Sequence, residues 1–289
     1  MDFLRPTTWA AALAAKAERP DARPIAGGTD VMVELNFDRA RPAALLDLTG
    51  IDELADWELD GGRVRIGAGV PYARVITELG GLLPGLAIAS RTVGSPQIRN
   101  RGTVGGNLGS ASPAGDAHPP LLAGDAEVEV ESVRGVRVLP IDGFFVRPKV
   151  SALEPDELIR AVRVGRATGP QQFAKVGTRN AMVIAVCSFA LALHPATRRA
   201  GTGIGSAGPT PLRAPAAEEF LSGTLDWNGR GPLDEGVGRR FGALVAAAAS
   251  PIDDVRGTAG YRRHALAVLA GRTLAWTWNA YRKGDAACA

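Results

Sequence analysis

The stretch that decides the fold is Ile25-Ala26-Gly27-Gly28-Thr29-Asp30, together with a second glycine pair in Thr103-Val104-Gly105-Gly106-Asn107. Each glycine pair stands beside hydroxyl or amide side chains. Adjacent glycines permit positive φ and close backbone approach, so successive N–H groups can converge on phosphate oxygens without a helix dipole. One Gly-Gly pair is typical of an ordinary turn. Two pairs with such neighbours favour a phosphate-binding site.

Helices and strands are expected to alternate around these two pairs. Helical spacing with strong helix formers predicts helices, and alternating or continuous apolar runs predict strands. The helices expected are residues 9–18, 31–37, 214–221, 240–248 and 259–281. The strands expected are residues 23–26, 44–48, 63–67, 127–131, 158–164, 185–193 and 200–204. Pro71 is expected in the first turn of a further helix.

The segment of residues 91–120 is rich in Gly, Pro, Ser and Asn and has little hydrophobic periodicity. It predicts a long irregular loop, and such loops are usually functional. Asp116, in the Ser-Pro-Ala-Gly-Asp that ends at this residue, could accept hydrogen bonds from ligand hydroxyls. His118 is expected to be a loop residue beside Pro119. Turn-forming residues at 165–170 predict the main domain boundary.

A third glycine-rich string, Gly203-Ile204-Gly205-Ser206-Ala207-Gly208, has the G-x-G-x-x-G pattern of dinucleotide-binding folds. In those folds the pattern must open a helix whose N-terminus faces the pyrophosphate. Pro209 and Pro211 follow at once and prevent a continuous helix. The string is therefore interpreted as a strand end and turn with no ligand.

Composition excludes several classes of protein. The 289 residues hold 33 Lys and Arg against 30 Asp and Glu, without the basic block that marks a nucleic-acid or membrane surface. No uninterrupted apolar run is long enough for a membrane span, and the N-terminus lacks a signal peptide pattern. The expectation is a cytoplasmic globular protein that has no nucleic-acid partner.

Cysteine and histidine usage argues against a metal centre in this chain. Cys187 lies in an apolar run, where it is expected to be a buried small hydrophobe, and Cys288 is near the C-terminus. Neither a disulfide nor an iron–sulfur cluster is expected from two such cysteines. His118, His194 and His264 are dispersed and show no ligand spacing. The sequence gives no catalytic residue either.

Three stretches carry a resemblance to a known family. They are residues 25–30, residues 95–108 (Ser-Pro-Gln-Ile-Arg-Asn-Arg-Gly-Thr-Val-Gly-Gly-Asn-Leu) and residues 112–116 (Ser-Pro-Ala-Gly-Asp). In content, order and spacing they resemble the FAD-binding medium subunits of molybdenum hydroxylases, the family of the xanthine dehydrogenase and carbon monoxide dehydrogenase flavoproteins. The likeness continues through residues 156–159, 173–185, 207–214 and 254–263. It covers essentially the whole chain.

The resemblance implies an α+β fold with two domains. Residues 1–168 would form an FAD-binding domain of the vanillyl-alcohol-oxidase (PCMH) type, with subdomains at about 1–52 and 53–168. Residues 169–289 would form a smaller C-terminal α+β domain of the carbon monoxide dehydrogenase flavoprotein type. FAD would lie extended between them.

The resemblance also implies the site. The glycine loops would bind the pyrophosphate, Asp116 the adenosine side, and Lys175 would approach the isoalloxazine, where a cation stabilises the reduced, anionic flavin. Ile184 matches a residue that shields the flavin, and many relatives carry Asp at the position of Val183. The cofactor-binding residues implied are Ile25, Ala26, Gly27, Gly28, Thr29, Asp30, Val31, Val93, Thr103, Val104, Gly105, Gly106, Asn107, Asp116, Ile159, Lys175 and Ile184.

The activity that the resemblance implies is electron transfer within a complex. A molybdopterin-binding large subunit would oxidise the substrate, and a [2Fe-2S] small subunit would pass electrons to the FAD of this chain. NAD⁺ or another acceptor would receive them. The amino-acid sequence as a whole most resembles xanthine dehydrogenase subunits, which suggests xanthine or hypoxanthine as the substrate of the complex. Two alternatives stay open: a stand-alone FAD-dependent oxidase or dehydrogenase, and an assembly subunit without FAD.

Overall fold

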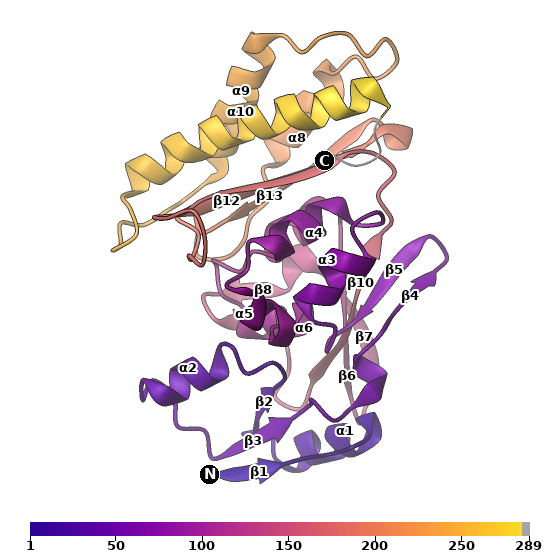
Figure 1. Ribbon diagram of the computed structural model, residues 1–289, viewed down its shortest axis with the longest axis vertical. Helices are drawn as coiled ribbons and strands as arrows, with labels where there is room; N and C mark the ends of the chain where they lie inside the picture. Colours follow the sequence, from indigo (N-terminus) through magenta and orange to yellow (C-terminus); the bar gives the residue numbers. More distant parts are fainter. Residues whose placement is uncertain (285–289) are drawn as a thin grey trace.

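The computed structural model describes residues 1–284, and they form the α+β fold that was predicted. In Figure 1 the chain runs from an N-terminal sheet at the bottom, through a middle layer of sheet and helices, to a C-terminal sheet under long helices at the top. Within the described residues, no helix combines the length and apolar character needed to cross a membrane.

The N-terminal layer is a three-stranded parallel sheet in the order β1-β3-β2. The Thr8 hydroxyl accepts a hydrogen bond from the backbone N–H of Ala11 and so caps the first helix. The strands are β1 (Asp2–Leu4), β2 (Arg23–Ile25) and β3 (Ala44–Asp47), and the helices are α1 (Trp9–Glu18) and α2 (Val31–Asn36). The first glycine pair lies between β2 and α2, as the sequence indicates.

The middle layer contains a five-stranded antiparallel sheet in the order β4-β5-β10-β6-β7. Its strands are β4 (Trp57–Asp60), β5 (Arg63–Gly67), β6 (Glu127–Ser132), β7 (Gly135–Pro140) and β10 (Leu158–Gly165). A small ribbon of β8 (Phe145–Arg147) and β9 (Val150–Ser151) lies beside it, and short 3₁₀ helices cover Asp52–Leu54 and Ile141–Gly143. The central strand β10 buries its apolar residues, whereas Arg160 and Arg163 stay partly exposed and pair with Glu129 of β6.

Short helices occupy the segment that was expected to be an irregular loop, so that prediction was wrong. The helices between β5 and β6 are α3 (Tyr72–Glu78), α4 (Pro84–Arg91), α5 (Pro96–Arg101), α6 (Val104–Ser110) and α7 (His118–Ala123). Ser95 and Thr103 cap α5 and α6 through their hydroxyls, and Pro96 starts α5 with a preset φ. These caps stabilise two helices whose apolar residues show little helical periodicity. His118 is therefore a buried helix residue and not the predicted loop residue.

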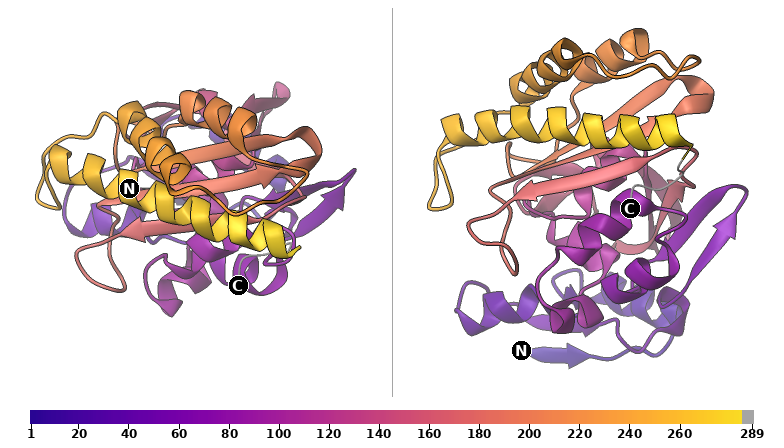
Figure 2. Two further views of the ribbon diagram at one scale, coloured as in Figure 1. Left: turned by 90° about the horizontal axis from the view of Figure 1, so that it is seen from above. Right: turned by 45° about the horizontal axis from the view of Figure 1, so that its top comes forward.

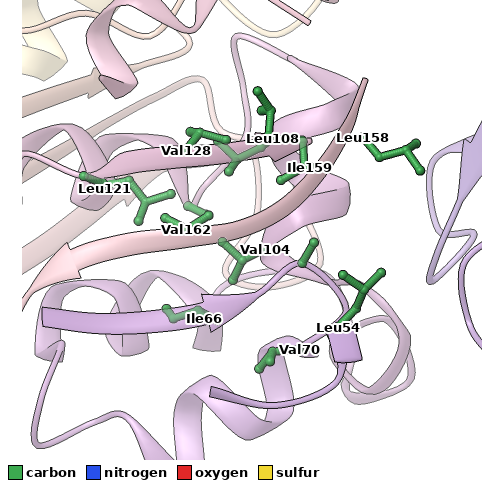
Figure 3. Packing of buried hydrophobic residues seen from close by; sticks show 14 of the residues in the cluster. Leu54, Ile66, Val70, Val104, Leu108, Leu121, Val128, Leu158, Ile159 and Val162 are labelled. Atoms are coloured by element: carbon green, nitrogen blue, oxygen red, sulfur yellow. The ribbon is translucent and has the colours of Figure 1, made fainter. Parts of the chain in front are cut away.

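The main core lies under the middle sheet. Val104 and Leu108 project from α6 toward Val128 of β6 and Val162 of β10, and Ile66 of β5 closes the group (Figure 3). All five side chains are fully buried. Helix α6 is therefore anchored by its apolar side, which fixes the position of the second glycine pair.

The C-terminal layer is an antiparallel sheet in the order β11-β12-β13, with the C-terminal helices on one face and α4 and α7 on the other. Figure 2 shows the long last helix lying across this sheet. The elements are β11 (Gln171–Val176), β12 (Cys187–His194), a 3₁₀ turn (Pro195–Thr197), β13 (Arg199–Gly205), α8 (Pro215–Thr224), α9 (Glu235–Ala248) and α10 (Ala259–Lys283). Cys187 is fully buried, as predicted, whereas Cys288 lies outside the described residues.

The Gly203–Gly208 string belongs to β13 and the turn after it, which confirms that it opens no helix. Its glycines have a packing role, because a β-carbon at Gly203 would stand 2.0 Å from the Pro119 carbonyl oxygen of α7. Gly201 meets the Ala123 carbonyl in the same way, at 2.1 Å. The glycines therefore let the C-terminal sheet lie directly on α7.

Candidate functional site

A cavity of about 870 Å³ lies between the N-terminal layer and helices α5 and α6. Both glycine pairs line it, together with Asp116, Ile159 and the loop between β11 and β12. A volume of this size is typical of sites for large organic ligands. The fold thus brings together two motifs that are more than seventy residues apart in the sequence.

All but three of the predicted site residues line this cavity. Val104 points away from the lining into the core, where it is fully buried. Ile25 and Lys175 also stand outside the lining. The side chain of Val104 faces the core because α6 has one face toward the cavity and another toward the core.

The two glycines of each pair have different roles. A β-carbon at Gly27 would lie 1.8 Å from the Arg101 carbonyl oxygen, and one at Gly105 would lie 2.5 Å from the Ala68 β-carbon. The first glycine of each pair therefore permits protein segments to pack. At Gly28, with φ of +74°, and at Gly106, an added β-carbon would meet only side-chain atoms at 3.0 Å or more. The second glycine keeps the backbone accessible.

A short helix follows the first glycine pair, and another short helix contains the second pair. Helix α2 begins at Val31, and α6 includes Gly105 and Gly106. The backbone N–H groups in the first turn of a helix have no partner within it. Among residues 1–284, those of Thr29 and Asp30 also donate to no protein acceptor. Donors suited to an anion are therefore concentrated at the cavity.

Three buried polar atoms at the cavity lack a hydrogen-bond partner among the described residues. They are the Tyr72 hydroxyl, Asn107 Oδ1 and Asp116 Oδ1, and all three residues line the cavity. Burial, with the nearby charges of Asp116 and Asp30, raises the pKa of Tyr72 well above its usual value. Buried polar groups are normally satisfied, so these atoms indicate a polar ligand that carries hydroxyl or amine groups. A nucleotide cofactor fits this set.

Asp116 and Lys175 form a buried ion pair beside the cavity. Lys175 Nζ lies 2.7 Å from Asp116 Oδ2, and the two side chains are 10% and 9% exposed. Burial raises the pKa of the Asp116 carboxyl, against the opposing effect of the Lys175 ammonium. Lys175 Nζ also donates to the carbonyls of Thr92 and Val183, at 2.9 and 3.2 Å. These contacts hold the Lys175 ammonium beside Asp116, which lines the cavity.

His118 supports the site from behind. Its imidazole is fully buried, with Nε2 3.2 Å from the Asn107 carbonyl oxygen and the ring 4.5 Å from that of Phe145. Burial lowers the pKa of His118 to about 4, so the ring is neutral near pH 7. The ring also occupies the space in front of Gly115, where a β-carbon would meet it at 2.3 Å. His118 thereby fixes the loop that carries Asp116.

Apolar side chains form another part of the lining. Ile159 is buried, whereas Ile184 is 54% exposed at the loop between β11 and β12. Val31, Val93 and Val183 also line the cavity. These surfaces suit the flat faces of aromatic rings.

Some lining residues were not predicted from the sequence. They include Tyr72, Ser110, Ser112, Lys149 and Glu157. Tyr72 stands directly after Pro71, a signal for a helix start but not for a ligand. In the described part of the chain, no three His, Cys, Asp or Glu side chains gather in a way that could hold a metal ion.

Two family models match this chain. Residues 1–166 match the FAD binding domain in molybdopterin dehydrogenase. Residues 172–277 match the carbon monoxide dehydrogenase flavoprotein C-terminal domain. The first match contains both glycine pairs, and the second contains Lys175 and Ile184.

Individual relatives agree with these matches. The xanthine dehydrogenase FAD-binding subunit of Escherichia coli O157:H7 is 33% identical over 75% of this chain and 77% of that protein. The nicotine 6-hydroxylase medium subunit of Paenarthrobacter nicotinovorans is 31% identical over 88% and 89%. A solved structure of Cu,Mo-CO dehydrogenase in its cyanide-inactivated form superposes with a TM-score of 0.89 at 28% identity, over 96% and 98%. The chain therefore belongs to the family of FAD-binding medium subunits of molybdenum hydroxylases, and it is the flavoprotein oxidoreductase subunit of such an enzyme.

Proposed function

We propose that this chain holds FAD in the cavity between its glycine pairs, receives electrons from a [2Fe-2S] small subunit, and passes them to NAD⁺ or another acceptor. A molybdopterin-binding large subunit would oxidise the substrate. When bound, FAD supplies the redox chemistry that links single-electron donors to two-electron acceptors. The observation that carries the proposal is the set of buried, unpartnered polar atoms beside two accessible glycine backbones.

The pyrophosphate would lie against the two glycine pairs. Gly28 and Gly106 leave the backbone open there, and the N–H groups of Thr29 and Asp30 are available as donors. The Thr103 hydroxyl oxygen already accepts the Gly106 N–H at 2.9 Å, so its own hydrogen remains for a phosphate oxygen. Ala26 and Gly27 complete this wall.

The adenosine side would lie near Asp116 and Asn107. Asp116 Oδ1 and Asn107 Oδ1 have no protein partner in the described residues, and both are acceptors suited to ribose hydroxyls or an adenine amine. The ring systems would contact the apolar lining residues Val31, Val93, Ile159 and Ile184. Val183 stands where many relatives have Asp, so this end of the cavity lacks that carboxylate.

The division of the chain near residue 168 is part of the same proposal. One hydrophobic core contains residues from Trp9 to Val164, and another contains residues from Cys187 to Tyr281. The FAD-binding domain would cover residues 1–168, with its subdomains meeting near residue 52, and the C-terminal domain residues 169–289.

The decisive experiment is purification of the chain with its native partners, followed by absorbance spectroscopy and analysis of flavin, molybdenum and iron. We expect one FAD for each copy of this chain, with molybdenum and iron in the partner chains. Absence of FAD, also after incubation with FAD, would refute the proposal. FAD with no molybdenum or iron partner, and oxidation of a small molecule by the chain alone, would support a stand-alone oxidase instead.

The substrate of the complex is a separate question. We propose a purine such as xanthine or hypoxanthine, because of the likeness to a xanthine dehydrogenase subunit. A nicotine hydroxylase subunit has a similar identity, however, and the substrate site would lie in another chain. Assay of the purified complex with xanthine, hypoxanthine, nicotine and carbon monoxide tests this point. Reduction of the flavin by only a non-purine would overturn the purine assignment.

A further inference from the structure

The Tyr72 hydroxyl is a buried polar group that no other described residue satisfies. Tyr72 is 2% exposed, and its hydroxyl oxygen has no hydrogen-bond partner within residues 1–284. A buried polar group without a partner destabilises a folded protein, and such groups are rare in native structures. A phenylalanine would fill the same space without this cost. The hydroxyl therefore indicates a role other than packing.

The ring of Tyr72 lies where the two glycine pairs come together. Its backbone N–H donates to the Gly102 carbonyl at 3.0 Å, and the preceding Pro71 forms an isolated β-bridge with Thr103. A β-carbon added to Gly102 would stand 3.5 Å from Cδ2 of the Tyr72 ring and 3.4 Å from the Thr29 hydroxyl oxygen. Thr29 follows the first glycine pair, and Thr103 precedes the second. Tyr72 is thus held beside both loops.

The surroundings of the hydroxyl keep it protonated. Tyr72, Asp30 and Asp116 all line the cavity. Burial, followed by the charges of Asp116 and Asp30, raises the pKa of Tyr72 well above its usual value. The phenol therefore keeps its proton near pH 7, and a phenol O–H can donate one hydrogen bond. Neither carboxylate accepts that bond in the described residues, so the donor is available to a ligand.

An anionic oxygen is the acceptor that suits this donor best. Hydrogen bonds to charged acceptors are shorter and stronger than those between neutral groups. In the proposed function the pyrophosphate of FAD lies against the two glycine pairs, which is where Tyr72 is held. The pyrophosphate is also the anionic part of oxidised FAD. It is therefore the part of the cofactor that this hydroxyl would meet.

We infer that Tyr72 is a further cofactor-binding residue: its hydroxyl donates a hydrogen bond to the pyrophosphate of FAD at the place where the two glycine pairs meet. This inference rests on the proposed FAD site and adds a side-chain donor to the backbone donors there. The buried hydroxyl costs stability in the apo-protein and gains a hydrogen bond in the complex with FAD. Removal of the hydroxyl alone should therefore weaken FAD binding without weakening the fold.

The experiment compares the full-length chain with Tyr72→Phe and with a control, Tyr261→Phe. Phenylalanine keeps the ring and removes only the oxygen. Tyr261 lies on α10 and is 50% exposed, so the loss of its hydroxyl should change little. Each protein is freed of flavin, and its melting temperature and its dissociation constant for FAD are measured. ADP, which has a pyrophosphate and no flavin, and riboflavin, which has the flavin ring and no phosphate, are then tested as competitors of FAD.

Tyr72→Phe should bind FAD roughly ten- to a hundredfold more weakly, the loss usual for a hydrogen bond to a charged group. ADP should lose affinity by a similar factor, whereas riboflavin should bind as it does to the wild type. The melting temperature of the apo-protein should stay equal or rise, because a buried hydroxyl without a partner is removed. Tyr261→Phe should match the wild type in every measurement.

Three outcomes would overturn the inference. Wild-type affinity of Tyr72→Phe for FAD would show that the hydroxyl meets no group of the cofactor. Equal losses with riboflavin and with FAD would place the contact on the flavin part and not on the pyrophosphate. Weaker binding together with a lower melting temperature would show that the hydroxyl supports the fold. All three leave the proposed function intact, whereas a wild type that binds no FAD would overturn the proposed function and the inference together.

Discussion

Gly27 and Arg101 are in backbone contact: a β-carbon added to Gly27 would stand 1.8 Å from the Arg101 carbonyl oxygen and 2.4 Å from its carbonyl carbon. Gly27 follows β2 of the N-terminal layer, and Arg101 ends α5 of the middle layer. This single contact brings the first glycine pair beside the second. The geometry of the cavity therefore depends on the absence of a side chain at residue 27.

Replacement of Gly27 by Ala should damage both the fold and the site. The new methyl group must push the Arg101 backbone away, and such overpacking costs typically about 1–3 kcal/mol or more. We expect a loss of about 3 kcal/mol in the free energy of unfolding of the apo-protein, measured in urea, together with loss of FAD binding. Gly81→Ala is the control, because nothing lies within 4 Å of a β-carbon there. Equal stability of the two variants would contradict the contact.

Replacement of Gly106 by Ala should weaken FAD binding and leave the stability of the apo-protein nearly unchanged. A β-carbon there would meet only the Thr103 hydroxyl oxygen, at 3.0 Å, and Gly106 lies inside α6, where Ala is favoured over Gly by up to about 1 kcal/mol. The free energy of unfolding of the apo-protein should therefore change by about 1 kcal/mol at most. Titration with FAD should show much weaker binding, because the methyl group faces the cavity. Wild-type affinity would show that the phosphates do not approach this glycine.

The sequence allows much of this arrangement to be predicted. The ends of α1 agree with the predicted helix at both residues, since Thr8 supplies a cap and the following residues are strong helix formers. The central strand β10 ends within one residue of the strand predicted at residues 158–164. Both glycine pairs were recognised, because only glycine suits such close approach. These are local signals, and local signals can be read without the fold.

The features of the fold and site that could not be predicted depend on contacts between residues far apart in the sequence. The helices α5 and α6 lack apolar periodicity, and the many glycines and prolines around them hide the capping residues Ser95 and Thr103. The start of α9 lies five residues before the predicted one because Asp234 caps it. The ion pair between Lys175 and Asp116 spans 59 residues and has no sequence signature.

The glycines of β13 lead to a third prediction. Gly203 lies in the string that imitates a dinucleotide motif, but its β-carbon would collide with the Pro119 carbonyl oxygen at 2.0 Å. Gly203→Ala should therefore lower the melting temperature of the apo-protein by several degrees, through loss of packing between α7 and the C-terminal sheet. The fraction that remains folded at low temperature should bind FAD with stoichiometry close to that of the wild type. A specific loss of FAD at wild-type melting temperature would instead assign a ligand role to this string.

The buried His118 predicts how stability depends on pH. Its pKa falls from 6.5 to about 4 on burial, so between these values the unfolded chain binds a proton that the folded chain does not. Stability is therefore lost as the pH falls from about 6.5 toward 4, by up to about 3 kcal/mol from this residue.

His118→Gln should remove this dependence, because glutamine does not titrate and its amide can still donate to the Asn107 carbonyl. The measurement is urea unfolding of both proteins at pH 7.0, 6.0 and 5.0. We expect the stability difference between wild type and variant to shift in favour of the variant as the pH falls. The carboxylates titrate alike in both proteins and cancel in this difference. His264→Gln, on the exposed face of α10, controls for the loss of a histidine elsewhere. Parallel pH profiles for wild type and His118→Gln would show that folding does not lower the pKa of the imidazole.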